Sequence, residues 1–175
     1  DEDAPDTVLD LSSTFADVDL TIGDSLTSTV VGNTNLSLAS ASLVGTTLTL
    51  DYLLDQHGTA TVTVRATDQW GDWVEDTFTV TVDPVNDAPT VDTPIADFTV
   101  DEDAPDTVLD LSSVFDDVDI ATNGDVVTLS VTSNTNSSLV SASLVGSTLT
   151  LDYLPDQFGT ATITVRATDL AGLWV

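Results

Sequence analysis

The chain has 175 residues, of which 30 are Asp or Glu and only two are Arg, with no Lys, so its formal net charge is −28. This charge excludes binding to nucleic acid or to anionic lipid, because both surfaces repel it. The apolar fraction of 41% excludes a disordered acidic tail and suffices for one or two domains with packed interiors.

The sequence also lacks two features, cysteine and a long apolar stretch, and this excludes further classes of protein. The chain has no Cys, which excludes disulfides, thiolate catalysis and Cys-based zinc sites. No stretch approaches the ~18 consecutive apolar residues of a transmembrane helix, and no signal peptide is visible. The sequence starts with Asp and contains no Met, so we expect a processed or excised piece of a longer chain, with any targeting signal outside it.

Alternating apolar and polar residues predict β-strands along most of the chain. Residues 59–68 place Ala and Val on one face and Thr on the other, and residues 77–82 and 147–153 alternate in the same way. Gly45 with Thr46 and Gly146 with Ser147 are typical of hairpin turns. Short strands without helical periodicity predict an all-β protein made of antiparallel sandwiches with about seven strands each.

The sequence repeats with a period of about 100 residues, which indicates a repeat array. Residues 1–13 recur unchanged as 101–113, and residues 33–68 recur as 134–169 with 30 of 36 positions identical. Residues 74–100 occur once and are predicted to form a last strand, a linker and a first strand. The first copy therefore lacks a counterpart of the opening strand at 94–100, and the second lacks a counterpart of the closing strand at 75–82.

Two Pro residues between 83 and 89 forbid ladder pairing and mark the boundary between the copies. The predicted organisation is a first repeat at 1–83, a linker at 84–93 and a second repeat at 94–175.

Clustered carboxylates predict a metal ion. By the alternation of its strand, Asp68 lies on the inward face, where an unpaired charge is costly. The chain has only two Arg, which cannot balance the acidic clusters. Carboxylate, amide and carbonyl oxygens without His or Cys select hard Ca²⁺.

The order of these clusters resembles that of the bacterial cadherin-like repeat, a calcium-binding domain of large surface and adhesin proteins. The motifs are DED at the start, DVD, a Pro-Asp-Gln turn in the second copy, VRATD and the linker VDPVNDAP, and together they span essentially the whole chain. The resemblance implies two tandem cadherin-like sandwiches with an immunoglobulin-like, Greek-key topology.

The resemblance also implies a set of calcium ligands. The opening acids are Glu2 and Glu102, the DxD pairs are Asp17 with Asp19 and Asp117 with Asp119, and the later acids are Asp55, Asp68, Asp156 and Asp169. Asp83, Asn86 and Asp87 match the family's linker ligands. At the one complete junction, the implied ligands are Glu2, Asp55, Asp83, Asn86, Asp87, Asp117, Asp119 and Asp169; the two ends keep the half-sites Asp17, Asp19, Asp68 and Glu102, Asp156.

The sequence departs from the family pattern in places. The last Asn of the family's linker is Ala88 here, and Leu53 and Leu154 replace a further Asp ligand. Asp24 and Asp125 stand where the family has an Asn after DxD. Fewer or more weakly bound ions are therefore expected than in an intact cadherin junction.

Other interpretations of the acids remain open. The DVD pairs and Asn86 with Asp87 are also typical of solvated turns. Low Lys and high Asp suit a concentrated-salt solvent, although such adaptation would disperse the acids instead of gathering them at strand ends.

No catalytic constellation is present, so the protein is not expected to be an enzyme. His57 is the single His, and Phe158 stands in its place in the second copy. Arg65 and Arg166 are expected to neutralise nearby acids, and Trp73 and Trp174 to pack at the start of the last strand.

The predicted function is a calcium-stiffened structural repeat of a secreted, cell-surface adhesin or fibre, in which bound ions rigidify the junction between repeats. One alternative is a self-assembling extracellular filament subunit, completed head to tail by strands from other copies of the same chain. The other is a carbohydrate-binding adhesin module for surface glycans, with Trp70 as its one candidate contact.

Overall fold

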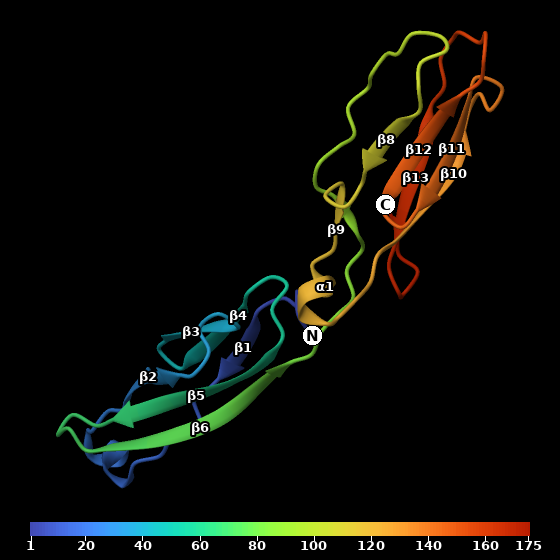
Figure 1. Cartoon of the computed structure of the whole chain (residues 1–175). Coiled ribbons are helices and arrows are strands. Elements are labelled where there is room, and N and C mark those ends of the chain that lie inside the picture. Colours follow the sequence, from blue (N-terminus) through green and yellow to red (C-terminus); the bar gives the residue numbers. More distant parts are fainter. The chain divides into compact units, whose positions relative to one another are not determined.

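The computed structural model describes all 175 residues and divides them into two compact units, Asp1–Val85 and Asn86–Val175. Both units consist of antiparallel strands with almost no helix, so the prediction of an all-β protein is confirmed (Figure 1). No helix has the length and hydropathy that crossing a lipid bilayer requires.

Unit 1 contains two three-stranded antiparallel sheets. The first has the order β1 (Thr7–Asp10), β4 (Thr47–Tyr52), β3 (Ala39–Val44), and the second has the order β2 (Thr27–Asn33), β5 (Gly58–Thr67), β6 (Trp73–Val82). A 3₁₀ helix, Val18–Ile22, lies between β1 and β2. The strands predicted at 59–68 and 77–82 are confirmed as β5 and part of β6.

The hairpin between β3 and β4 shows why Gly is needed at its turn. Val44 pairs with Thr47, so the loop has two residues, and Gly45 adopts a φ of +62°. Side chains with a Cβ rarely adopt this backbone conformation. The equivalent hairpin of unit 2 has Gly146 at φ +61°, as the sequence predicts for both turns.

The core of unit 1 lies between its two sheets. Its buried residues come from β3, the residue just before it and β4 on one side, and from β5 and β6 on the other: Leu38, Ala39, Leu48, Leu50, Ala60, Val62, Val64, Val80 and Val82. The inward positions of β5 are the Ala and Val residues that the period-two alternation predicts.

Unit 2 repeats this arrangement with differences at its edges. Its sheets are β8 (Thr107–Asp110), β12 (Thr148–Tyr153) and β11 (Val140–Val145); β10 (Thr128–Asn134) and β13 (Ile163–Thr168); and β7 (Thr90–Val91) with β9 (Phe115–Asp116). A short helix, α1 (Asp119–Thr122), follows β9. The buried core residues are Leu111, Val114, Val140, Leu149 and Leu151.

The predicted opening strand at 94–100 is wrong, because the structure assigns no strand there. Ile95 and Phe98 are three residues apart, so in a strand they would point to opposite faces. Both remain exposed, at 42% and 48%. The strand that does form near this point, β7, lies within the predicted linker and pairs with β9.

The two Arg residues stack on the two Trp residues. The guanidinium of Arg65 lies 4.2 Å from the centre of the Trp73 ring, and that of Arg166 lies 4.1 Å from the Trp174 ring. Arg65 also forms an ion pair with Glu75 at 2.6 Å, which confirms its predicted neutralising role. Arg166 has no acidic partner in an ion pair, so for this residue the prediction is wrong.

Candidate metal centre

Three carboxylates of unit 2 lie close together in the loops that follow β9, α1 and β13. Asp117 follows β9, Asp125 follows α1, and Asp169 follows β13, and each offers an oxygen within 4.8 Å of the others. Their side chains are nearly covered, with exposed fractions of 4%, 8% and 7%. We call Asp117, Asp125 and Asp169 the buried acidic triad.

Backbone amides hold one oxygen of each triad carboxylate. Asp117 Oδ1 accepts from the amide of Asp119 at 3.0 Å. Asp125 Oδ1 accepts from Val126 at 2.6 Å and from Leu170 at 3.1 Å, and Asp169 Oδ1 accepts from Leu173 at 2.7 Å. The local loops therefore orient all three carboxylates toward a common point.

The second carboxylate oxygens of Asp117 and Asp125 make the triad a candidate cation site. Oδ2 of each is buried and has no hydrogen-bond partner. A buried charged oxygen without a partner is costly, and a bound cation removes that cost. The chemistry of these donors fits a hard metal ion.

Two triad members have pKa values shifted in opposite directions. Burial, together with the nearby charges of Asp125, Asp119 and Asp169, raises the pKa of Asp117 above its ordinary value of 3.8. Burial also disfavours the charged form of Asp169, but hydrogen bonds from the Asn86 side chain and from the amide of Leu173 outweigh it and lower the pKa of that carboxyl.

These shifts predict how stability depends on pH when no metal is present. The folded state binds the Asp117 proton more tightly than the unfolded chain, so the free energy of unfolding rises as pH falls from the raised pKa toward 3.8. Asp169 acts in the opposite direction, and its stabilising contribution is lost only below 3.8. Urea unfolding in EDTA between pH 7 and 4 measures the first effect.

The variant Asp117→Asn serves as the control for this dependence. It should lose the part of the pH-dependent gain that Asp117 contributes and leave the effect of general charge repulsion. Equal slopes for the variant and the natural sequence would contradict the assignment.

Asp119, predicted as a ligand together with Asp117, is 2% exposed but has partners for both oxygens. Its Oδ2 accepts from the backbone amide of Asp87 at 2.7 Å, and its Oδ1 accepts from Asn123 Nδ2 at 2.6 Å. In this arrangement Asp119 positions the start of unit 2 instead of pointing a free oxygen at the triad.

The first residues of unit 2 are attached to these carboxylates. The Nδ2 of Asn86 donates to Asp169 Oδ2 at 2.8 Å, and the amide of Asp87 donates to Asp119 as described. The predicted linker ligands Asn86 and Asp87 therefore lie beside Asp169 and Asp119, two of the predicted ligands of the second copy.

Unit 1 has the same arrangement in a more open form. Asp17, Asp24 and Asp68 offer oxygens within 4.8 Å of one another, and all three side chains are half-buried. Asp24 Oδ1 accepts from the amides of Ser25 and Gln69, as its counterpart in unit 2 does. Asp19, a further predicted ligand, is exposed and lies outside this group.

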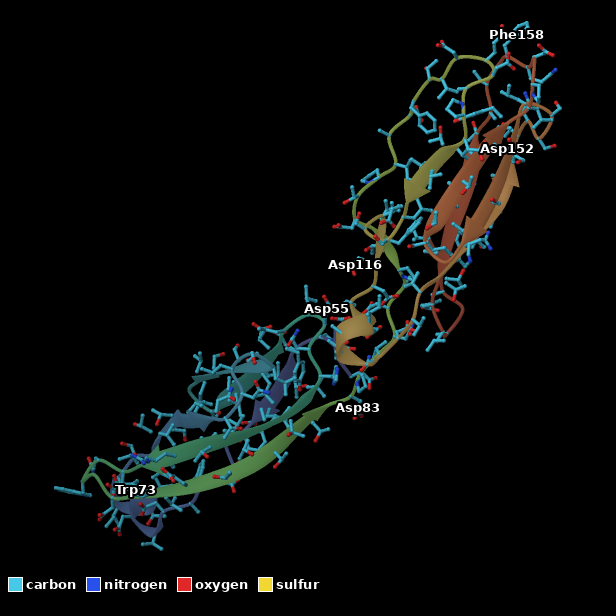
Figure 2. The ribbon with its side chains drawn as sticks, in the orientation of Figure 1. Asp55, Trp73, Asp83, Asp116, Asp152 and Phe158 are labelled. Atoms are coloured by element: carbon cyan, nitrogen blue, oxygen red, sulfur yellow. The ribbon has the colours of Figure 1, made fainter.

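The predicted ligands at the other end of each unit are held differently. Glu2 is buried, and its Oε1 accepts from the amide of Val85 at 2.7 Å while its own amide donates to the carbonyl of Asp83 at 2.8 Å. The amide of Asp55 donates to Asp3 Oδ1 at 3.1 Å (Figure 2 labels Asp55 and Asp83).

In unit 2, Glu102 is exposed, and the amide of Asp156 donates to Asp103 Oδ1 at 2.9 Å. Asp55 and Asp156 both adopt positive φ, at +55° and +57°, which Asp tolerates better than most residues. Their predicted roles as ligands stay predictions.

Asp24 and Asp125 complete the two groups, although neither was in the predicted ligand set. Their signal in the sequence is their position shortly after the DVD motif, where the family has an Asn. The turn between this motif and the next strand brings Asp24 close to Asp17 and Asp125 close to Asp117.

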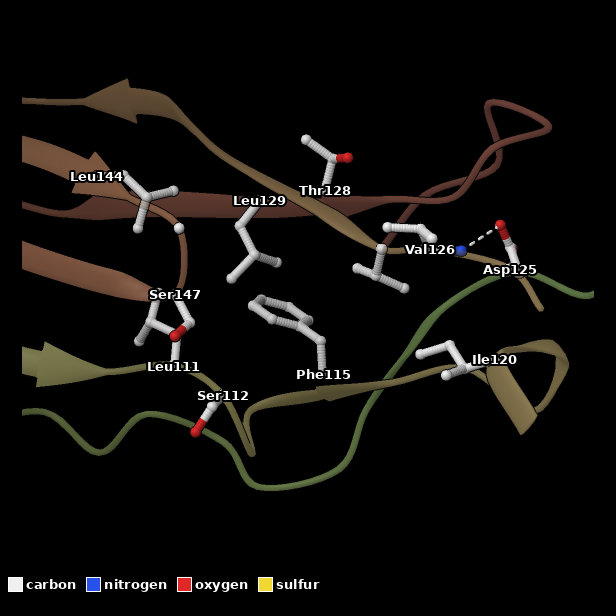
Figure 3. A pocket seen from close by; sticks show the side chains of 12 residues that line it. Leu111, Ser112, Phe115, Ile120, Asp125, Val126, Thr128, Leu129, Leu144 and Ser147 are labelled. Atoms are coloured by element: carbon white, nitrogen blue, oxygen red, sulfur yellow. Dashed lines mark hydrogen bonds between the residues drawn. The ribbon is translucent and has the colours of Figure 1, made fainter.

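An apolar groove of about 640 Å³ opens beside the triad in unit 2. Figure 3 shows the Phe115 ring facing Leu129, with Asp125 at the end of the groove. Asp125 is the only charged residue in its walls. Ser28 of unit 1 stands where unit 2 has Leu129, so unit 1 has a polar side chain at this position.

Comparison with known proteins gives no assignment: no protein-family model and no curated protein matches this sequence.

Proposed function

We propose that the chain consists of two tandem cadherin-like β-sandwiches and acts as a calcium-stiffened structural repeat of an extracellular, cell-surface adhesin or fibre, without enzymatic activity. The observation that carries this proposal is the buried acidic triad, in which Asp117 and Asp125 each keep a buried oxygen without a partner. Such oxygens favour a resident cation over a solvated turn.

Calcium is the metal that this set of donors favours. The triad offers only carboxylate oxygens, and the neighbouring Asn86 adds an amide, whereas zinc or copper sites use His or Cys. The chain supplies no competing cation, because Arg65 pairs with Glu75 and Arg166 stacks on Trp174.

Stiffening follows from the hydrogen bonds that attach the connecting segment to Asp169 of the triad and to the neighbouring Asp119. Asn86 donates to Asp169, and Asp87 donates to Asp119, so both depend on carboxylates that repel one another when no cation is bound. A cation that neutralises the triad supports both hydrogen bonds. The segment that joins the two units then loses conformational freedom at its unit 2 end.

Calorimetric titration with Ca²⁺ tests this proposal. Dissociation constants on the order of 10⁻⁴ to 10⁻³ M are expected, as for extracellular modules. Asp125→Asn should weaken binding at the triad about tenfold or more, because it removes a buried ligand charge. Asp152→Asn changes the net charge equally on the exposed face of β12 and should change binding little.

Two results would contradict the proposal. Equal losses from both variants would mean that net charge governs the response instead of a site. NaCl that replaces Ca²⁺ fully would favour adaptation to salt.

Exposure of Trp70 favours a second candidate function, the binding of surface glycans. Its side chain is 80% exposed in the loop after β5, next to Asp68, whose Oδ1 accepts from the Trp70 amide at 2.9 Å. Sugars stack on exposed aromatic rings of this kind. Trp70→Ala should abolish retention on immobilised glycans, and retention that survives this change would remove the candidate.

A further inference from the structure

We infer that the free edge of β11 is a surface for lateral self-association, and that its partner is the same strand of a second copy of this chain, paired antiparallel. The inference does not depend on calcium binding. Three observations carry it: the distribution of charge along the chain, the backbone groups that β11 leaves unpaired, and the apolar groove beside this strand.

Charged residues are absent from the part of unit 2 that contains β11. Residues 126–151 include no Asp, Glu, Lys, Arg or His, although 18% of the chain is charged, and residues 25–50 of unit 1 are free of charge in the same way. These segments contain the edge strands β10 and β11 of unit 2 and β2 and β3 of unit 1, whereas the edge strands β1, β6 and β8 each carry an acid. A second copy, which also carries −28, therefore meets no fixed charge along this edge.

β11 lacks the features that protect an edge strand from pairing. Proteins blunt such edges with charged residues, with Pro or with β-bulges. β11 has the sequence VSASLV and pairs with β12 without a shift in register. The neighbouring edge strand β10 is interrupted by a register shift between Val131 and Ser133. In unit 1, β3 shares the uncharged and regular edge, because residues 40–44 repeat residues 141–145.

The backbone groups of β11 that point outward determine how a second strand can pair. The carbonyl of Val140 accepts from Asn134 Nδ2 at 2.7 Å, so the peptide groups of Val140 point away from β12. Because this direction alternates along an antiparallel strand, those of Ala142 and Leu144 point outward as well. No backbone hydrogen bond from outside the β11–β12 ladder reaches either residue.

A second β11 satisfies these groups when a two-fold axis passes through Ser143. In that register, Ala142 of each copy lies opposite Leu144 of the other, and the two residues exchange both of their backbone hydrogen bonds. Ser143 lies opposite its own counterpart in a pair without hydrogen bonds, and Ser141 lies opposite Val145. The same surface patch serves both copies, as a two-fold symmetric contact requires.

The side chains on both faces of β11 fit this partner. On the inner face, Leu144 lines the apolar groove of about 640 Å³, and Ala142 of the second copy comes to lie beside it (Figure 3). On the outer face, Val145 is 79% exposed and comes to lie opposite the small Ser141. Pairing therefore removes apolar surface from water on both sides of the joined sheet.

Disulfide trapping in EDTA and about 1 M NaCl tests the contact and its register. The chain has no Cys, so a single Cys substitution reports one position. Ser143→Cys should form disulfide-linked dimers about tenfold faster than Ser141→Cys, because only Ser143 meets its own counterpart. Both side chains are exposed, so their replacement should leave the fold intact. In a mixture of Ser141→Cys and Val145→Cys, the mixed dimer should predominate over either homodimer.

Sedimentation velocity in EDTA measures the same association without a covalent bond. The dimer fraction of the natural sequence should rise severalfold between about 0.01 M and about 1 M NaCl, because salt screens the repulsion between the two chains and leaves the uncharged contact in place.

Charged substitutions on matched strands separate the edge from general charge. Ser143→Asp combined with Ser42→Asp in β3 places like charges opposite each other in the pair and should weaken dimerisation about tenfold. The control combines Ser130→Asp in β10 with Thr29→Asp in β2, which makes the same change of net charge at exposed positions of the other sheets and should change dimerisation little.

Equal rates of disulfide formation for Ser141→Cys and Ser143→Cys would overturn the inference, because the register would then have no influence. A natural sequence that stays monomeric at about 1 M NaCl would also overturn it, as would equal weakening by the two double variants. Dimers that form only when Ca²⁺ is present would assign the association to the metal centre instead of to this edge.

Discussion

Removing calcium is expected to lower the thermal stability of unit 2 more than that of unit 1. At ten times the dissociation constant, bound Ca²⁺ adds about 1.4 kcal/mol to the free energy of unfolding. For a unit of this size the thermal midpoint shifts by roughly 4–8 °C per kcal/mol. The triad of unit 2 is buried, whereas Asp17, Asp24 and Asp68 are half-buried. Water screens the repulsion among the half-buried carboxylates, so a bound cation stabilises unit 1 less than unit 2.

Calorimetry in Ca²⁺ and in EGTA measures the shift, and hydrogen exchange assigns it to a unit. Peptides from β12 should become less protected in EGTA, while those from β4, the matching strand of unit 1, should change less. Residues 86–89 should also exchange faster in EGTA. Equal protection in both buffers would contradict the proposed stiffening.

Replacing Leu48 with Ala is expected to cost unit 1 about 3–5 kcal/mol of unfolding free energy. Leu48 is 0% exposed and lies on β4 at the centre of the core, so truncation loses buried apolar contacts and leaves a cavity between the two sheets. A loss of this size is a large part of the stability of a domain with fewer than 100 residues. Urea unfolding measures it.

The matched control for this variant is Leu36→Ala. Leu36 is 69% exposed, and the second copy has Ser137 in its place. Its truncation should change the free energy of unfolding by less than about 0.5 kcal/mol. Similar losses from Leu36→Ala and Leu48→Ala would mean that the core of unit 1 does not lie where the structure places it.

Local patterns in the sequence were sufficient to predict most strands and turns. The alternation of Val and Thr identified β5 and its buried face, and Gly45 and Gly146 identified two hairpins. These features depend on backbone geometry and on the two faces of one strand, which neighbouring residues encode. Ala96, Phe98 and Val100 alternate with polar residues at 94–100, yet this segment forms no strand because it pairs with no other strand in the structure.

The acidic motifs predicted part of each candidate site. Asp117 and Asp169 were expected together, and the structure adds Asp125 to them. Asp119 belongs to the same motif, yet its oxygens accept from Asp87 and Asn123. Motif spacing can place a carboxylate at a strand end, but it does not say which amide its oxygens will meet.

Burial was decided only by the tertiary structure, and the two copies show this most directly. Val64 of β5 is 2% exposed because residues of β4, from the other sheet, and of β6, beside it, pack in the same core, and both strands lie elsewhere in the chain. The two acidic groups also differ in burial, because Asn86 donates to Asp169 of the buried acidic triad, whereas Asp17, Asp24 and Asp68 are half-buried. The local sequence sets the face of a strand on which a residue lies, whereas the exposure of that residue depends on neighbours that can be distant in the chain.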